Sequence, residues 1–270
     1  MASLTDVTRP TPRGDGYHLE VPAGWRQGRG AFGGFTVASL IRAIELKVAD
    51  PARLVRSVTA ELPAPVETGS AAITVDLLRT GKHLSAARAA LVQGTEVRGH
   101  AVAVLAASRP GSGPAGWRDL APPEVPSWRT LEPLPARSAD PRMQWPEFSQ
   151  HFEYRVVEGL PFVSGAPART VGWVRPRVPC ELRDVAYVAS MLDVWWPAAF
   201  TKFPPTRPCA TIAYTLEMVT NLDGLDPDAP LLYRGTVPVC GDGFFLETRE
   251  LWGEDGRLVA LNHQTFAIIA

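Results

Sequence analysis

The pattern of apolar and polar residues predicts two similar series of elements, each with one helix among several strands. In the first series, the apolar side chains of residues 35–48 recur at the spacing of one helix face, and Pro51 follows that helix. Beyond it the pattern changes to alternation, in which every second residue is apolar. Such alternation indicates an antiparallel sheet with one buried face. Strands are predicted there at 57–62, 73–77, 84–92 and 97–105.

The second series repeats this order in the second half of the chain. A strongly apolar helix is predicted at 185–200, and a turn at Asp255-Gly256 separates the last two strands. Strands are predicted at 152–157, 170–174, 210–219, 231–239, 244–251 and 258–269. Because strand, helix and antiparallel run occur twice, we predict an α+β fold, a tandem double hotdog with two antiparallel sheets, each wrapped around a central helix. Pairing the two sheets edge to edge would remove exposed edges.

A proline-rich stretch separates the two series. Nine of the 26 prolines fall between Pro110 and Pro146, a density that neither a helix nor an interior strand tolerates. Its tryptophans, Trp117, Trp128 and Trp145, suggest that the stretch lies against the protein surface. So long a connection is unusual inside one domain, and it therefore marks a boundary. The predicted parts are an N-terminal hotdog at 1–108, a linker at 109–147 and a C-terminal hotdog at 148–270.

Composition argues against several classes of protein. The 27 basic and 28 acidic residues leave a formal net charge of -1, whereas nucleic-acid binding needs a clustered basic excess. No uncharged apolar run reaches the roughly 18 residues of a membrane-spanning helix. The three cysteines fit neither a disulfide framework nor a zinc site, which favours a reducing compartment. We therefore expect a cytoplasmic protein, and the use of arginine over lysine suggests a bacterial source.

Two familiar kinds of site, for a dinucleotide and for a metal ion, do not fit the rest of the sequence. Gly28 to Gly33 match the G-x-G-x-x-G of dinucleotide sites, but the alternating strands that follow oppose the parallel sheet such a site requires. The five histidines are scattered without an i,i+4 pair, so metal binding is not expected. The glycines have two other interpretations. They form a flexible turn that permits tight packing, or Gly33 and Gly34 begin a helix whose N–H groups hold a negative oxygen.

The most informative residue is Asp193, the only charged residue between Val185 and Thr201. A lone carboxylate in so apolar a helix is costly unless it is hydrogen-bonded or lines a wet cavity. It is therefore either a candidate functional acid or a structural group that shares a polar stripe with Ser190. Gln264 lies among apolar residues on one face of the last predicted strand, and it likewise needs a partner.

Several segments are similar to motifs of one known family. Gly28 to Gly34 (GRGAFGG) precede an apolar helix, and Arg79 to Arg88 (RTGKHLSAAR) match an R-x-G-x-x-x-S-x-x-R strand pair. Together they resemble the type II acyl-CoA thioesterase family, whose members are tandem double hotdogs. That family carries an Asp on its second hotdog helix, a Thr in A-T-I and a Gln near the C-terminus. The matching positions here are Asp193, Thr211 and Gln264.

The resemblance implies an acyl-CoA thioesterase, which hydrolyses an acyl-CoA thioester to the free acid and CoA. In the family the Asp, Thr and Gln hold the hydrolytic water, so Asp193 would activate that water while Thr211 and Gln264 position it. The thioester oxygen gains negative charge as water attacks, and it needs donors at that moment. The N–H groups of Gly33 and Gly34 at the helix start are the candidates.

The implied substrate also sets expectations for partners. CoA carries phosphates, and Arg79, Lys82 and Arg88 are candidate contacts for them, unless they are ordinary solvated charges. No metal or other cofactor is expected, since CoA enters as part of the substrate. The small-molecule acyl-CoA is the expected partner, with no nucleic acid and no membrane. Association into a homo-oligomer is common in the resembled family, although one chain already pairs two hotdogs.

Two other functions stay open on the sequence. One is a hotdog hydratase or dehydratase acting on acyl thioesters. That chemistry normally requires a His or an Asp/His pair, and no His lies on the helix of Asp193. The other is a non-catalytic module that binds acyl-CoA or lipid without activating a water. Release of CoA from a panel of acyl-CoAs separates hydrolysis from binding alone.

Overall fold

The computed structural model describes residues 2–109, 116–135, 145–162, 167–180, 182–204, 207–218, 220–226 and 228–269. The N-terminal half contains α1 (Leu4–Val7), β1 (Thr11–Arg13), β2 (Gly16–Val21), β3 (Arg26–Gln27), β4 (Gly30–Ala31), α2 (Gly33–Val48), β5 (Leu54–Glu61), β6 (Gly69–Thr80), β7 (Leu84–Gln93) and β8 (Glu96–Ala106). The C-terminal half follows, with η1 (Trp128–Thr130), η2 (Glu147–His151), β9 (Phe152–Glu158), β10 (Arg169–Pro176), α3 (Val185–Asp193), η3 (Ala198–Thr201), β11 (Cys209–Glu217), β12 (Leu231–Gly241), β13 (Phe244–Trp252) and β14 (Leu258–Ile268).

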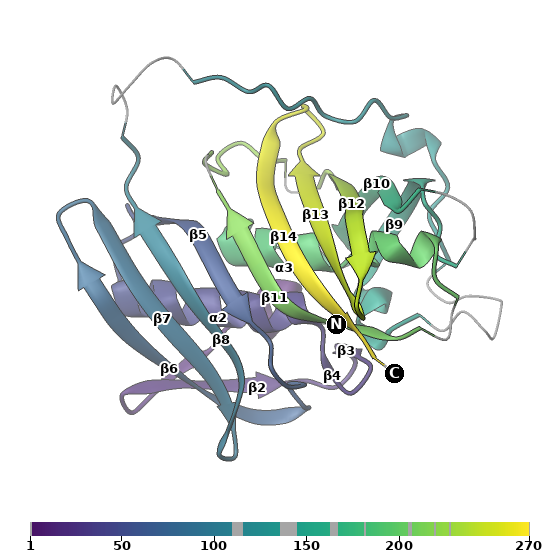
Figure 1. The fold of residues 1–270 in the computed structure, drawn as a ribbon. Coiled ribbons are helices and arrows are strands. Elements are labelled where there is room, and N and C mark those ends of the chain that lie inside the picture. Colours follow the sequence, from purple (N-terminus) through teal and green to yellow (C-terminus); the bar gives the residue numbers. More distant parts are fainter. Residues whose placement is uncertain are drawn as a thin grey trace.

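Twelve of these strands form one continuous antiparallel sheet (Figure 1). Its order is β1-β2-β6-β7-β8-β5-β11-β14-β13-β12-β10-β9, while β3 and β4 make a separate small ribbon. The two halves of the chain meet where β5 pairs with β11, with Thr59 opposite Thr215. The sequence predicted two sheets. Their edge-to-edge pairing joins them into one, so that neither half has an exposed edge at the join.

The two halves share one strand topology. If the five main strands of each half are numbered along the chain, they lie in the order 1-3-4-5-2 in both halves, as β2-β6-β7-β8-β5 and as β10-β12-β13-β14-β11. In both halves the long helix connects the first of these strands to the second. The repeat predicted from the hydrophobic pattern is therefore present at the level of topology.

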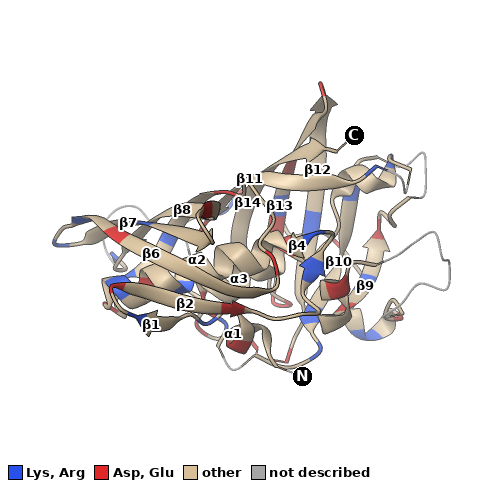
Figure 2. Ribbon diagram, turned by 90° about the horizontal axis from the view of Figure 1, so that it is seen from below, with Lys and Arg blue, Asp and Glu red and all other residues tan. Residues whose placement is uncertain are grey.

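The helices α2 and α3 lie in the hollow of the curved sheet and pack against each other (Figure 2). The hydroxyl of Ser190 on α3 donates to the carbonyl oxygen of Gly34 on α2, at 3.1 Å. Near the other end of α3, Arg42 of α2 forms an ion pair with Asp184, the N-cap of α3. Buried apolar side chains of both helices belong to one cluster. The two halves therefore share a single hydrophobic core.

The predicted helix at 185–200 is wrong in its C-terminal half. The helix ends at Asp193, and a short 3-10 turn, η3, follows after Pro197. A residue that precedes proline is disfavoured in the helical conformation, so Trp196 cannot easily continue α3. Asp193 is therefore the last residue of the helix instead of lying in its middle. The helix predicted at 35–48 is confirmed, with its start at Gly33.

Residues 116–135 of the proline-rich stretch pack against the C-terminal half (Figure 1). The indole of Trp173 donates to the carbonyl oxygen of Pro126, at 3.1 Å. Arg155 donates to the carbonyl oxygen of Trp128, at 2.6 Å. Trp117, in contrast, is 77% exposed, so only some of the tryptophans hold the stretch down. The rest of the predicted linker includes residues 110–115 and 136–144, which lie outside the described residues.

Candidate active site

The carboxyl group of Asp193 is buried between the two helices and the sheet. Only 6% of the residue is exposed. One carboxylate oxygen, Oδ2, accepts a hydrogen bond from the backbone N–H of Gly34, at 2.7 Å. The other, Oδ1, accepts from the side-chain amide of Gln264, at 2.9 Å, and from Nη1 of Arg249, at 3.1 Å. These bonds satisfy most of the acceptor capacity of a buried charge, which would otherwise be very costly.

Gln264 links Asp193 to Thr211. Its Oε1 accepts a hydrogen bond from the hydroxyl of Thr211 on β11, at 3.0 Å. Its amide nitrogen donates to Asp193 and also to Oδ1 of Asn262, the latter at 3.1 Å. The three residues that the resemblance selected therefore form one connected network from α3, β11 and β14. Asn262 was missed, although it shares the inward face of the last strand because it lies two residues before Gln264.

The start of α2 faces Asp193. A Cβ atom at Gly33 would lie 2.9 Å from Oδ2 of Asp193, and one at Gly34 would lie 2.9 Å from its Cβ. The glycines are therefore needed for close approach between the helices. The N–H of Gly34 was expected to receive the substrate oxygen, but it donates to Asp193 itself. Gly33 occupies the first position of the helix, where an N–H has no intrahelical acceptor.

Two further charged residues, Arg249 and Glu247, lie beside Asp193 and were missed by the sequence analysis. Arg249 is 1% exposed, and its Nη1 donates to the carbonyl oxygen of Leu192, at 2.8 Å, as well as to Asp193. Its Nε donates to Oε1 of Glu247, at 3.0 Å. The signal was present in the alternation of β13, because Glu247 and Arg249 fall on the same face as the buried Phe245.

Burial and charge act on these groups in opposite directions. Burial raises the pKa of Asp193, against the charge of Arg249 and the hydrogen bonds from Gln264 and Gly34. Burial also raises the pKa of Glu247. Burial alone would lower the pKa of Arg249, but the neighbouring acids outweigh it and raise that pKa, so the guanidinium stays charged. Two buried acids therefore share one permanent cation.

The other side chains near Asp193 stay neutral. Burial raises the pKa of Cys209 to about 12, so its thiol remains protonated at neutral pH and is a poor nucleophile. Tyr214 and Tyr154 are fully enclosed, and burial raises the pKa of each. The hydroxyl of Tyr154 donates to the carbonyl oxygen of Val194, next to Asp193, at 2.9 Å. Apart from Arg249 and Glu247, these titratable neighbours of the acid are therefore uncharged.

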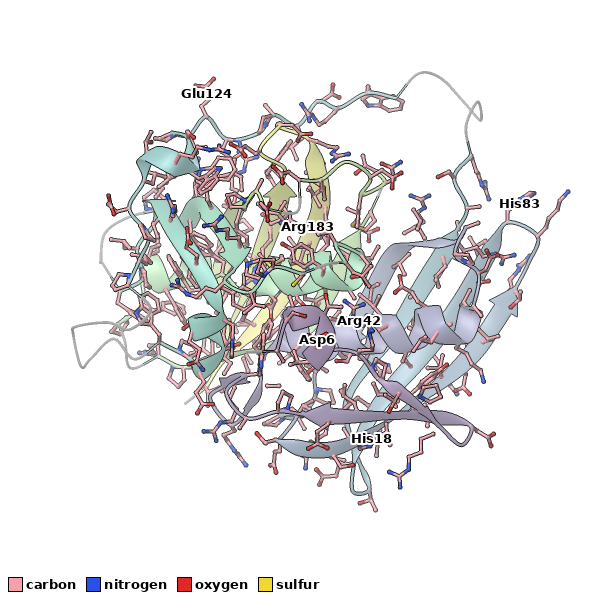
Figure 3. All side chains as sticks on the ribbon, turned by 180° about the vertical axis from the view of Figure 1, so that it is seen from behind. Asp6, His18, Arg42, His83, Glu124 and Arg183 are labelled. Atoms are coloured by element: carbon pink, nitrogen blue, oxygen red, sulfur yellow. The ribbon has the colours of Figure 1, made fainter. Side chains whose placement is uncertain are left out.

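The three residues expected to contact CoA phosphates lie elsewhere. Arg79, Lys82 and Arg88 are exposed on the β6–β7 hairpin, and Arg88 pairs with Asp76 at 2.9 Å. Figure 3 shows His83, at the tip of this hairpin, at one edge of the molecule. None of the hydrogen bonds and ion pairs among the described residues connects the three to Asp193. A phosphate contact there stays a prediction.

The described ranges contain no cluster of three His, Cys, Asp or Glu side chains placed to hold a metal ion. Within the same ranges no helix is both long enough and apolar enough to cross a membrane. Acidic and basic side chains are distributed over many elements (Figure 2).

A large antiparallel sheet around central helices is the fold that the resemblance to the acyl-CoA thioesterases predicts. Family models bear this out. Residues 21–108 match the acyl-CoA thioesterase N-terminal domain, and residues 125–268 match the acyl-CoA thioesterase C-terminal domain. The chain therefore belongs to the acyl-CoA thioesterase family and is a thioester hydrolase. The family assignment favours hydrolysis over the hydratase and the binding module that the sequence left open.

Several solved structures share the fold over almost the whole chain. A conserved protein of unknown function with a hot dog fold from Alicyclobacillus acidocaldarius is 23% identical, with a TM-score of 0.86, covering 100% of this chain and 99% of that one. Acyl-CoA thioesterase II TesB2 from Mycobacterium marinum is 18% identical, with a TM-score of 0.78, covering 99% of this chain and 98% of that one. At these identities the likeness concerns the fold alone. No curated protein matches the chain.

Proposed function

We propose that the chain is a tandem double hotdog that hydrolyses an acyl-CoA to the free acid and CoA, with Asp193 as the general base. The two hotdogs would be residues 1–108 and 148–270, separated by the linker at 109–147. The observation that carries the proposal is the hydrogen-bonded connection of Asp193 through Gln264 to Thr211. It brings an acid, an amide and a hydroxyl from three elements to one place.

The donors around Asp193 suggest where the water is held. A carboxylate has about four acceptor positions, and three are used by Gly34, Gln264 and Arg249. Two of those three bonds go to Oδ1, so the open position is on Oδ2. A water that donates one hydrogen there can donate its second to Oε1 of Gln264 or to the hydroxyl oxygen of Thr211. One of its lone pairs is then free to attack the thioester carbon.

The reaction follows from this arrangement. The water oxygen forms a bond to the carbonyl carbon while Asp193 takes the proton, and the carbonyl oxygen becomes an oxyanion. Collapse of the tetrahedral intermediate breaks the carbon–sulfur bond, and the thiolate of CoA leaves and accepts the proton that Asp193 took from the water, which restores the carboxylate. In the proposal the N–H of Gly33 receives the oxyanion, because Gly34 already holds Asp193. Removing one oxyanion donor typically costs about 10²–10³ in rate. Only water is needed as co-reactant, and no cofactor is invoked.

Replacement of the base tests the proposal. Asp193→Asn is expected to lower turnover by about 10²–10⁴-fold, the usual contribution of a general base. The variant should still fold, because Arg249 keeps its ion pair with Glu247. Release of CoA from a panel of acyl-CoAs, followed with a thiol reagent, measures the effect. Asp15→Asn, at an exposed turn, is the matched control and should match the wild type. Full turnover by folded Asp193→Asn protein would remove Asp193 from the mechanism.

A further inference from the structure

Asp193, Arg249 and Glu247 form a line of three buried charges. The guanidinium lies between the acids, donating through Nη1 to Oδ1 of Asp193 and through Nε to Oε1 of Glu247. The side chains of Arg249 and Glu247 are 1% and 0% exposed, and that of Asp193 is 4% exposed. With both acids ionised the group carries one negative charge in a site from which water is largely excluded. Because little water is present to screen these charges, each charge interacts strongly with its neighbours.

The protein fixes the guanidinium in this position. Arg249 also donates to the carbonyl oxygen of Leu192, and it lies over the rings of Phe266 and Tyr233. Its planar fork therefore has partners along two edges and aromatic rings against its faces. It cannot move away from Asp193 without losing several contacts. The cation is a permanent part of the site.

Glu247 is equally well held. Its Oε1 accepts from Arg249 and from the hydroxyl of Tyr233, the latter at 3.0 Å. Its Oε2 accepts from the backbone N–H of Ala198, at 3.1 Å. Asp193 also has three donors, but it lies at the end of the line next to the proposed water. The first proton that enters this group from the reaction is therefore expected on Asp193.

Among the described residues, Asp193 forms an ion pair with Arg249 and with no other charged side chain. In the described part of the chain, the other titratable side chains that interact electrostatically with Asp193 are Tyr154 from β9, Cys209 and Tyr214 from β11, and Tyr233 from β12. Burial raises the pKa of each, so all four stay neutral through the working range of an enzyme. Gln264 and Asn262 on β14 carry no charge. Arg249 and Glu247 alone among these neighbours can change the electrostatic state of the acid.

We propose that Arg249 and Glu247 are positioning residues that control how firmly Asp193 holds its negative charge. Arg249 keeps the buried acid ionised between turnovers. Glu247 draws on the same cation and so prevents Arg249 from stabilising Asp193 to the point where it no longer accepts a proton. The inference rests on the proposed function, in which Asp193 is the base. It adds to that function two residues that never touch the substrate.

The idea predicts opposite effects from two substitutions. Arg249→Met removes the positive charge, so the acid limb of the pH profile of kcat/KM should move to higher pH, by about 1–3 pH units. Glu247→Gln removes the competing negative charge, so that Asp193 is the only acid still paired with Arg249. Its limb should move to lower pH. General damage to the fold lowers activity in both variants but does not displace the two limbs in opposite directions.

Further variants keep the test decisive. Arg249→Lys preserves the charge and should keep the limb near that of the wild type. Arg234 and Glu250, neighbours in the same β12–β13 pairing, form an ion pair that is partly exposed. Arg234→Met and Glu250→Gln are therefore matched controls, and neither should displace the limb. If Arg249→Met does not fold, Glu247→Gln still gives the answer, because its limb should move to lower pH while that of Arg249→Lys stays in place.

The outcomes separate this inference from the proposed function. If Asp193→Asn is inactive but the limb stays in place in Arg249→Met and Glu247→Gln, the base assignment stands and the control by Arg249 and Glu247 is overturned. The same holds if both limbs move in one direction. If Asp193→Asn retains turnover, the proposed function itself fails. Opposite movement of the two limbs, with unchanged controls, supports the inference.

Discussion

At the scale of single residues, Gln264 shows how closely one side chain is specified by its neighbours. Its amide nitrogen faces two oxygens, on Asp193 and Asn262, and its oxygen faces a hydroxyl, on Thr211. Only one orientation of the amide satisfies all three. A glutamate of the same size would offer no donor to Asp193 and would add a like charge. A neutral amide is therefore the group that can connect the acid to the hydroxyl without competing for the proton.

A third acid, the partly buried Glu45 on α2, predicts a pH dependence of stability. Burial, and then the charge of Asp184, raise its pKa from 4.5 to about 7, with Arg42 opposing. Between these two values the folded chain binds more protons at this position than the unfolded chain, so stability falls as the pH rises through that window. Glu45→Gln removes the effect. Its Tm relative to the wild type should therefore be higher at pH 8 than at pH 5.

Thermal unfolding at both pH values measures this difference. Glu124→Gln is the matched control, because Glu124 is exposed at the edge of the molecule (Figure 3). Its Tm difference from the wild type should be the same at pH 5 and pH 8. An equal difference at the two pH values for Glu45→Gln would show that Glu45 does not titrate in this window.

At the scale of elements, the close contact of α2 and α3 depends on Gly34. A Cβ atom there would lie 2.6 Å from Cε2 of Phe32, 2.9 Å from Cβ of Asp193 and 3.0 Å from Cα of Ser190. Two of these atoms are anchored on α3, so the helices must separate to make room. Gly34→Ala is expected to destabilise the protein by about 1–3 kcal/mol, as overpacking does, and to lower turnover by moving Asp193.

Urea unfolding and CoA release measure the two effects of Gly34→Ala. Gly241→Ala is the control, because a Cβ at Gly241 meets no atom within 4 Å and its φ is not positive. Gly34→Ala should lower both stability and turnover, whereas Gly241→Ala should leave both at the wild-type level. Wild-type turnover in Gly34→Ala would show that the helix contact does not hold the acid in place.

Most long elements could be predicted from their hydrophobic period, and the exceptions have physical causes. The strands β6, β7 and β8 alternate clearly because one face is buried and the other meets solvent. The end of α3 was wrong because its apolar residues continue past Asp193, and composition does not show where a core-facing helix gives way to a turn. The short strand β1 carries no burial pattern that a sequence could reveal.

The candidate site was accessible from the sequence only in part. Asp193 stood out as one charge in an apolar helix, whereas Thr211 gave no signal of its own and entered through the family resemblance. Arg249 and Glu247 alternate correctly with buried residues, yet a charged pair on a strand is more often solvated than buried. Their role depends on a contact with α3, which is 56 residues away from Arg249 along the chain. Such long-range pairing is not encoded in any local pattern.

At the scale of the whole molecule, contacts from three sources tie the two halves together. The β5–β11 ladder continues the sheet from one half into the other, and the α2–α3 contact joins their cores. In addition, the ring of Trp25 stacks on His151 with centroids 3.9 Å apart, and Arg26 forms an ion pair with Glu147. The site itself is assembled across this boundary, because Gly34 comes from one half and Asp193 from the other.

These contacts predict that the halves unfold together. Chain length alone allows separate transitions, since two domains often unfold independently. Here unfolding of the N-terminal half would expose the β5-facing edge of β11 and the α2-facing side of α3, so neither half is expected to stay folded alone.

Hydrogen exchange followed by mass spectrometry tests whether the two halves unfold together. Slowly exchanging amides of β7 and β8 should open with the same free energy, and the same urea dependence, as those of β13 and β14. A lower free energy confined to β7 and β8 would mean that the N-terminal half opens by itself. In that case the N–H of Gly34 would leave Asp193 during each such opening, and loss of turnover in urea would precede unfolding of the C-terminal strands.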